Sequence, residues 1–430
     1  CCSGRAFRSV YQGLPAVATE LNCAKCGACA VACPVFRIDE REVLTARGKM
    51  HLLTTTLAEQ PSTVFEDLFS RCLLCGACEQ VCPRQLPITD IISQARSAFS
   101  PFYGPNGLKK AAACTALSHP ELVDGLVKAG ISLHRLQALP VLSGLRLKLG
   151  LLEERTRPSL PKNNDTPSRK DQEEQPASAI SYFTGCLARH IQPSIAEATQ
   201  TLLSKSNLPP AQVPAEQYCC GLAAWSAGKR EQARELARKN IQAFSAPALA
   251  DTPIITSCAS CSSHLLAYPT LFDEHDPWHG KAVAFADRVR EFTSFFDDKL
   301  PISPCIDTPE HPKHTKKRFF YHDPCHLRFK DKGMSAPRSL LQKTGVHILE
   351  PEEGPHCCGQ GGLFHLACPE HSAQIFEQSS RQALAGSPDC VTTTCSGCLM
   401  QYQEGLARQG QQVKAVHMAI LLADFLNKRP

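Results

Sequence analysis

The spacing of its cysteines constrains this chain more than any other feature of the sequence. The 430 residues include 24 cysteines, and ten of these stand in C-x2-C groups. Such spacing is typical of metal ligands, whereas the cysteines of a short secreted disulfide scaffold exceed about 8–10% of its residues. A chain of this length also buries enough surface to fold without disulfides. We therefore predict thiolates that bind metal, in a reducing compartment.

The composition excludes other kinds of protein. Hydrophobic residues make up 43% of the chain and charged residues 20%, as in ordinary globular proteins. The net charge of +5 is small and evenly spread, so no nucleic-acid partner is expected. The sequence has no run of about 18 apolar residues without charges, so no transmembrane segment is expected either.

Two copies of one motif lie within the first 100 residues. Each copy reads C-x2-C-x2-C-x3-C-P, the bacterial two-cluster pattern in which the fourth cysteine of each motif binds the other cluster. Gly27 and Gly76 allow the backbone to approach cluster sulfur closely. A zinc site is the alternative, but zinc does not need this spacing twice. The expected ligands of two [4Fe–4S] clusters are Cys23, Cys26, Cys29 and Cys82 for one and Cys33, Cys72, Cys75 and Cys78 for the other.

The remaining C-x2-C groups belong to an internal repeat of five cysteines. In the first copy, 32 residues separate Cys186 from Cys219, and 36 separate Gly221 from Cys258. The corresponding intervals in the second copy are 31 and 35 residues, which indicates a duplication. The repeated cysteines are Cys186, Cys219, Cys220, Cys258 and Cys261, then Cys325, Cys357, Cys358, Cys395 and Cys398.

Strands and helices alternate in both copies of the repeat. Apolar runs at 180–183, 253–256, 319–321, 346–349 and 391–394 precede cysteines, and helical patterns such as 230–244 and 369–385 follow. This alternation predicts parallel sheets with the cysteines beyond the carboxyl ends of the strands. In the N-terminal part, 41–59 and 64–71 are predicted to be helical. The expected fold class is α+β multidomain: a helical two-cluster ferredoxin domain followed by two α/β cysteine-rich repeats.

The cysteines and the polar, proline-rich stretches between them also predict domain boundaries. These are 1–100 for the two-cluster domain, 101–152 for a helical connector, 153–178 for a flexible linker, 179–299 for the first cysteine-rich domain and 318–430 for the second.

Each cysteine-rich repeat offers five thiolates, one more than a tetrahedral metal ion needs. Adjacent cysteines cannot both be ordinary tetrahedral ligands without strain, so an irregular iron–sulfur cluster is favoured. Zinc and reduced thiols without metal are the alternatives. His322, His326 and His356 flank the cysteines of the second repeat, where they either tune a cluster, relay protons or simply hydrogen-bond the backbone. The run Gly359–Gly362 lacks the Lys-Ser/Thr of a P-loop, so we expect it to allow close backbone approach to a cluster.

These motifs together resemble a known family. The two ferredoxin motifs plus two Cys-Cys-Gly (CCG) repeats look like the iron–sulfur subunit of glycolate oxidase, within the wider family of heterodisulfide reductase cysteine-rich subunits and related lactate and glycerol-3-phosphate dehydrogenase subunits. The resemblance covers nearly the whole chain except the predicted linker. Arg47-Gly48-Lys49 looks like the Arg-Gly-Arg of that family, and His322–His326 is similar to the segment that opens its second repeat.

The resemblance implies an oxidoreductase subunit that transfers electrons. A separate flavin-containing dehydrogenase subunit would oxidise glycolate or D-lactate, and the electrons would pass through the two cubanes to a quinone or another electron carrier. The sequence agrees with a flavin on another chain, because no G-x-G-x-x-G motif follows a strand. No catalytic residue is then expected here. The implied location is the cytoplasm, either free or peripheral on the cytoplasmic face of the membrane.

A second hypothesis stays open. Some members of the family have an incomplete first repeat, whereas both repeats here have all five cysteines. This favours a heterodisulfide reductase-like function, in which the CCG cysteines hold clusters that reduce a disulfide.

Overall fold

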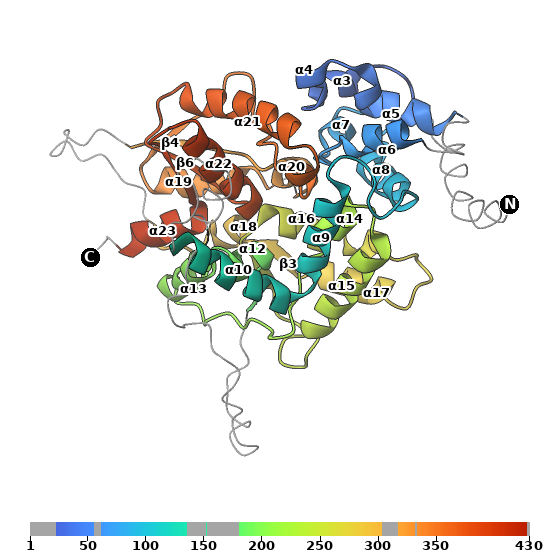
Figure 1. The fold of residues 1–430 in the computed structure, drawn as a ribbon. Helices are drawn as coiled ribbons and strands as arrows, with labels where there is room; N and C mark the ends of the chain where they lie inside the picture. The colour runs from blue at the N-terminus through green and yellow to red at the C-terminus, as the bar shows by residue number, and fades with distance from the viewer. Residues whose placement is uncertain are drawn as a thin grey trace. The chain divides into compact units, whose positions relative to one another are not determined.

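A computed structural model describes residues 23–55, 62–135, 152, 180–302, 317–331 and 333–427 of the chain (Figure 1). The predicted linker at 153–178 lies outside the described residues. The chain divides into two compact units, and each is described by itself. The first unit comprises residues up to Ala116 together with Gly221–Ala233 and His356–Ser379, and the second comprises Leu117–Cys220, Arg234–Pro355 and Ser380 onward.

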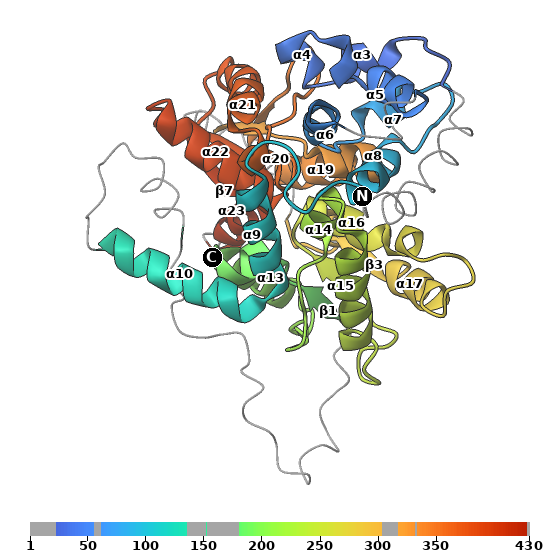
Figure 2. The same ribbon diagram turned by 45° about the vertical axis from the view of Figure 1, so that its right-hand side comes forward.

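The first unit is helical, as the sequence predicts. Its helices, drawn mostly in blue in Figure 2, are α3 (Ala28–Ala32), α4 (Phe36–Asp39), the short η1 (Glu42–Leu44), α5 (Ala46–Leu53), α6 (Thr63–Ser70), α7 (Ala77–Gln80), α8 (Ile88–Ser97), α14 (Leu222–Ser226) and α20 (Phe364–Ala367). Helices α9 (Gly107–Ser118), α15 (Arg230–Ala243) and α21 (Pro369–Leu384) begin in this unit and end in the second.

Aromatic side chains form much of the first unit's core. Phe65 and Phe69 are one helical turn apart on α6, and their rings stack with centroids 4.6 Å apart. Phe99 packs edge-on against both of these rings and against Tyr103. The helix predicted at 41–59 is interrupted at Thr45, whose hydroxyl accepts a hydrogen bond from the Gly48 amide and so starts α5 as its N-cap.

The second unit holds the strands and the remaining helices. The strands are β1 (Ser181–Phe183), β2 (Ile254–Thr256), β3 (Val289–Glu291), β4 (Arg318–Tyr321), β5 (His347–Leu349), β6 (Cys390–Thr393) and β7 (Lys414–His417). The helices are α10 (Pro120–Arg135), α12 (Cys186–His190), α13 (Ser194–Lys205), α16 (Ala259–Leu266), η3 (Tyr268–Leu271), α17 (His279–Ala286), α18 (Phe292–Phe296), the π-type η4 (Leu327–Asp331), α19 (Ser335–Lys343), α22 (Ser396–Arg408) and α23 (Met418–Asn427).

The two sheets of the second unit repeat one topology. Both are wholly parallel, with strand orders β1-β2-β3 and β5-β4-β6-β7. A single bridge between Ser181 and Gln212 occupies, beside β1, the place that β5 takes beside β4. The duplication in the sequence is therefore a duplication of sheets. The strand predictions at β1, β2, β4, β5 and β6 are confirmed, whereas β3 and β7 were not predicted.

One hydrophobic core joins the two sheets within this unit. It contains Tyr182 from β1 and Tyr321 from β4, both at most 1% exposed. Helices α13 and α23 pack side by side against it, with Leu202 and Leu422 fully buried (Figure 2). Among the described residues, no helix combines the length and the hydrophobicity that crossing a membrane requires.

Candidate iron–sulfur sites

The first unit contains two cavities, each lined by four cysteines. The outer cavity encloses about 370 Å³ of atom-free space including its mouth, and the inner cavity about 440 Å³. The cysteines that line them are Cys23, Cys26, Cys29 and Cys82 for the outer cavity and Cys33, Cys72, Cys75 and Cys78 for the inner one. Each cavity thus combines three cysteines of one motif with the fourth cysteine of the other.

Glycine conformation gives each cysteine motif its shape. Gly27 has φ +84° and Gly76 has φ +83°, and each precedes a short helix, α3 or α7. A residue with a Cβ adopts this left-handed conformation only at a cost. The turn brings neighbouring cysteines to one cavity wall.

Backbone amides and buried surroundings suit these cavities to iron–sulfur clusters. The Arg47 amide donates a hydrogen bond to Cys29 Sγ at 3.4 Å, and the Leu74 amide donates to Cys72 Sγ at 3.5 Å. Burial raises the pKa of the Cys75 and Cys78 thiols well above the ordinary value. Their thiolates therefore need a cation, and iron supplies one.

Helix α5 presents one cation to each cavity. Residues two apart on an α-helix point about 200° away from each other. Arg47 accordingly lines the outer cavity and Lys49 lines the inner one. Ala46, at the start of the helix, lines both cavities. Burial lowers the pKa of Lys49, and the thiols of Cys72 and Cys33 oppose that shift.

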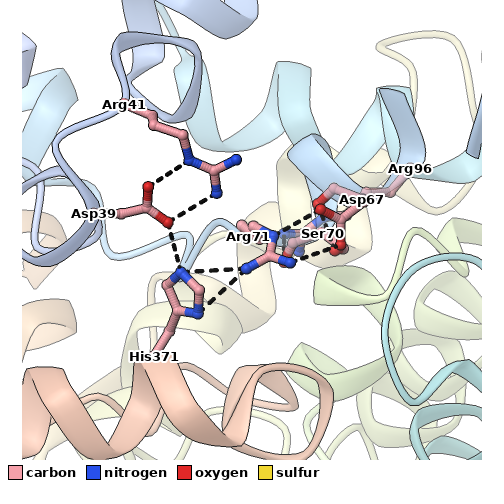
Figure 3. A network of polar contacts seen from close by, with 7 residues as sticks. All are labelled: Asp39, Arg41, Asp67, Ser70, Arg71, Arg96 and His371. Atoms are coloured by element: carbon pink, nitrogen blue, oxygen red, sulfur yellow. Dashed lines mark hydrogen bonds and ion pairs between the residues drawn. The ribbon is translucent and has the colours of Figure 1, made fainter. Parts of the chain in front are cut away.

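A polar network ties α21 to the helices around the inner cavity (Figure 3). His371 Nε2 lies 2.9 Å from Asp39 Oδ2, and Arg71 Nη1 lies 3.2 Å from the same ring nitrogen. Arg71 also pairs with Asp67 at 2.7 Å and lines the inner cavity. Hydrogen bonds from Arg41, and then from His371, hold the pKa of the Asp39 carboxyl well below its usual range.

The segments that follow both CCG motifs pack against the two-cluster part of the first unit. Arg96 Nη1 donates to the Ser226 carbonyl at 2.6 Å, and Tyr103 Oη donates to the Ala227 carbonyl at 3.2 Å. A Cβ on Gly361 would overlap the side chain of Leu73, which lies in the loop between Cys72 and Cys75. The glycine run that was predicted to approach a cluster thus packs against the loop of the second ferredoxin motif.

All five cysteines of the first repeat belong to the second unit, and the structure gathers them. Cys186 begins α12 directly after β1, and its Sγ lies 3.8 Å from Cys219 Sγ. Cys261 hydrogen-bonds with Cys220 and Cys258, and these contacts raise the pKa of its thiol well above the ordinary value. A metal that replaces the thiol protons would remove this penalty.

Two side chains that sequence reasoning did not identify hold the adjacent cysteines in place. Asn240 Nδ2 donates to the Cys219 carbonyl at 3.0 Å, and Tyr268 Oη donates to the Cys220 carbonyl at 2.9 Å. Asn240 is fully buried on an otherwise apolar face of α15. A lone amide among apolar positions of a helix is the signal that could have identified it.

The cysteines of the second repeat are divided between the units. Cys357 and Cys358 belong to the first unit, where the Gly359 amide donates to Cys357 Sγ at 3.4 Å. Cys325, Cys395 and Cys398 belong to the second unit, where each of the last two is buried.

The C-x2-C pairs of the two repeats meet within the second unit. Hydrogen bonds from Cys258, Cys398 and Ser260 lower the pKa of Cys395 well below its ordinary value. Ser260 Oγ lies 3.1 Å from Cys395 Sγ and 2.8 Å from His326 Nδ1. His322 is buried, with its Nδ1 3.3 Å from Tyr402 Oη. A ring nitrogen of His322 also lies within 4.8 Å of Cys398 Sγ, close enough for the two side chains to share a metal ion.

Comparison with known proteins gives the family. The model of a 4Fe-4S dicluster domain matches residues 20–86, and that of a cysteine-rich domain named CCG matches twice, at 180–266 and 319–403. The chain is 28% identical over 425 residues to a probable glycolate oxidase iron-sulfur subunit of Bacillus subtilis, covering 94% of this chain and 93% of the relative.

Two other relatives match about half of the chain and nearly all of it, respectively. Lactate utilization protein A of Shouchella clausii is 30% identical over 244 residues, which are 56% of this chain and 98% of that protein. One component of the dihydromethanophenazine:CoB–CoM heterodisulfide reductase of Methanosarcina acetivorans is 24% identical, over 94% of this chain and 93% of its own length. The chain therefore belongs to the CCG family of oxidoreductase iron–sulfur proteins that contains lactate utilization protein A and the glycolate oxidase iron-sulfur subunit.

Proposed function

We propose that this chain is the electron-transfer subunit of a flavin-dependent dehydrogenase that oxidises a 2-hydroxy acid, glycolate or D-lactate. The observation that carries the proposal is the pair of four-cysteine cavities in the first unit. Ala46 and Ile88 line both cavities, so clusters held there would be neighbours. A [4Fe–4S] cluster accepts and donates single electrons, which suits a path between two redox partners.

The proposed ligands follow the cavity walls. Cys23, Cys26, Cys29 and Cys82 would hold the cluster of the outer cavity, and Cys33, Cys72, Cys75 and Cys78 that of the inner cavity. The five cysteines of each CCG repeat would hold further iron–sulfur clusters or zinc. Buried thiols with raised pKa values in the first repeat support a metal there, because metal binding releases the thiol protons.

The electron donor would be a flavin on another chain, and the acceptor a quinone or another electron carrier. The names of the relatives support such a partner, since they describe iron–sulfur subunits of glycolate oxidase and proteins of lactate utilization. Oxygen-sensitive clusters and reduced thiols support a cytoplasmic location, free or peripheral to the membrane.

The test is reduction of this chain by substrate through its partner. The chain would be purified anaerobically together with a flavin-containing dehydrogenase subunit, and the cluster absorbance would be followed after glycolate or D-lactate is added. Cys75→Ser should abolish transfer to the natural acceptor, because it removes one inner-cavity ligand. Cys114→Ser is the matched control, since Cys114 is also buried in the first unit but lines neither cavity. Full-rate substrate oxidation by Cys75→Ser with that acceptor would refute the proposal.

A second candidate is disulfide reduction at the CCG motifs. The gathering of all five cysteines of the first repeat favours it, because an irregular cluster with a free coordination position could bind a thiol. Reduction of a heterodisulfide by the dithionite-reduced chain alone, lost in Cys219→Ser, would favour this candidate over the first.

A further inference from the structure

Among the residues that the structure describes, Lys49 is a buried lysine without an acidic partner. Its side chain is 1% exposed, and its ammonium donates a hydrogen bond to the Leu44 carbonyl. In the part of the chain that the structure describes, no carboxylate forms an ion pair with it. An isolated ammonium costs several kcal/mol to bury, and burial alone favours the neutral amine. The ammonium form is therefore retained where a charge of opposite sign compensates it.

The inner cavity is where that compensating charge would lie. Lys49 lines this cavity together with Cys33, Cys72, Cys75 and Cys78. A [4Fe–4S] cluster with four thiolate ligands is an anion, and reduction adds one more negative charge. A nearby fixed cation in a low-dielectric site therefore stabilises the reduced form more than the oxidised form.

Two cations line the outer cavity, and neither is buried as Lys49 is: Arg84 is exposed to water. Arg47 pairs with Glu42 at 2.8 Å, and the two side chains are 29% and 61% exposed. The carboxylate cancels much of the guanidinium charge, and water screens the remainder. Helix α5 thus supplies an uncompensated cation to one cavity and a neutralised one to the other.

We propose that Lys49 raises the reduction potential of the inner cluster above that of the outer cluster, so that a shared electron rests at the inner site. This inference rests on the ligand sets of the proposed function. The transfer is balanced without a proton: the outer cluster loses one electron and is oxidised, and the inner cluster gains it and is reduced. Lys49 acts through its charge on the reduction potential of the inner cluster and is not a catalytic residue.

The experiment is a redox titration of the full chain with dithionite, followed by electron paramagnetic resonance. It needs neither substrate nor flavin partner, so its failure is distinct from failure of the dehydrogenase function. Cys26→Ser assigns the signals, because Cys26 lines only the outer cavity. In the wild type, the first electron should occupy the inner cluster at least tenfold over the outer one, a difference of about 59 mV for a one-electron couple.

Three substitutions then separate charge from packing. Lys49→Met should lower the inner potential and remove the tenfold preference, whereas Lys49→Arg should keep it because the charge is kept. Lys25→Met is the matched control, since Lys25 adjoins Cys26 but is exposed, and the preference should persist.

Two results would overturn the proposal. One is a Lys49→Met protein with unchanged iron content and an unchanged preference. The other is a wild type whose first electron occupies the outer cluster. If Lys49→Met binds only one cluster, the wild type decides: a first electron on the inner cluster supports the proposal, and a first electron on the outer cluster contradicts it.

Discussion

Replacing Arg96 with methionine should destabilise the first unit by about 3–5 kcal/mol. Arg96 is 6% exposed and donates to backbone carbonyls from three parts of this unit. Its guanidinium contacts the carbonyls of Phe69, Ser70, Cys72 and Ser226 at distances of 2.6 to 3.1 Å. It therefore links α6, a cysteine motif and the segment after the first CCG motif.

The magnitude follows from what the substitution leaves behind. Each buried carbonyl without a donor costs about 1–3 kcal/mol, so four carbonyls sum to about 4–12 kcal/mol. Methionine also avoids the several kcal/mol needed to bury a guanidinium. This offset places the net loss near the lower end of that sum, at about 3–5 kcal/mol, because methionine fills most of the space but donates no hydrogen bond.

The assay is anaerobic urea unfolding of the full chain, monitored by circular dichroism, with iron measured before each titration. Arg37→Met is the matched control, because Arg37 is exposed and donates one 3.2 Å hydrogen bond to the Val31 carbonyl. The control should change the unfolding free energy by less than about 0.5 kcal/mol. If Arg96→Met at full iron content stays within about 1 kcal/mol of wild type, the account of this linkage is wrong.

Three further predictions concern backbone packing, pH dependence and the CCG loop. Gly361→Ala should lower the unfolding free energy by about 1–3 kcal/mol in the same urea assay, because of its positive φ and the overlap with Leu73; an unchanged midpoint would contradict this. The depressed pKa of Asp39 contributes stability that is present above about pH 4 and is lost as the pH falls further. The unfolding free energy of Asp39→Asn should therefore fall less steeply with acid than that of the wild type. Identical acid profiles of the two proteins would contradict this prediction. Asn240→Ala should lower the unfolding free energy by about 1–3 kcal/mol, because it leaves the Cys219 carbonyl without this donor. It should also lower the metal content per chain, measured by elemental analysis, because the first repeat would bind less metal. An unchanged metal content would contradict this role of Asn240.

Local sequence spacing predicts most of the candidate site. Three cysteines of a C-x2-C-x2-C motif reach one cavity because a single turn of chain carries them. The placement of Cys82 with the first motif and Cys33 with the second was also predictable, because the fourth cysteine of each motif binds the other cluster in the bacterial two-cluster pattern. The duplication of the sheets likewise follows from repeated intervals between cysteines.

Long-range contacts account for what the sequence did not predict. Arg96 reads as an ordinary residue of an amphipathic helix, and only the fold brings the Ser226 carbonyl to it from 130 positions away. The edge strands β3 and β7 carry arginine, glutamate, lysine and histidine. Such a composition lacks the apolar run by which the other strands were predicted. The assembly of the segments after both CCG motifs with the two-cluster part is also invisible in local pattern.

The central claim is that the two cavities of the first unit each hold a [4Fe–4S] cluster. The most direct measurement is iron, acid-labile sulfide and zinc per chain after strictly anaerobic purification. The account predicts at least about eight iron atoms and eight sulfides, four of each per cluster, with any excess belonging to the CCG repeats. It also predicts a loss of about four of each in Cys75→Ser and no loss in Cys114→Ser. Zinc in place of iron, or equal iron content in Cys75→Ser and wild type, would contradict it.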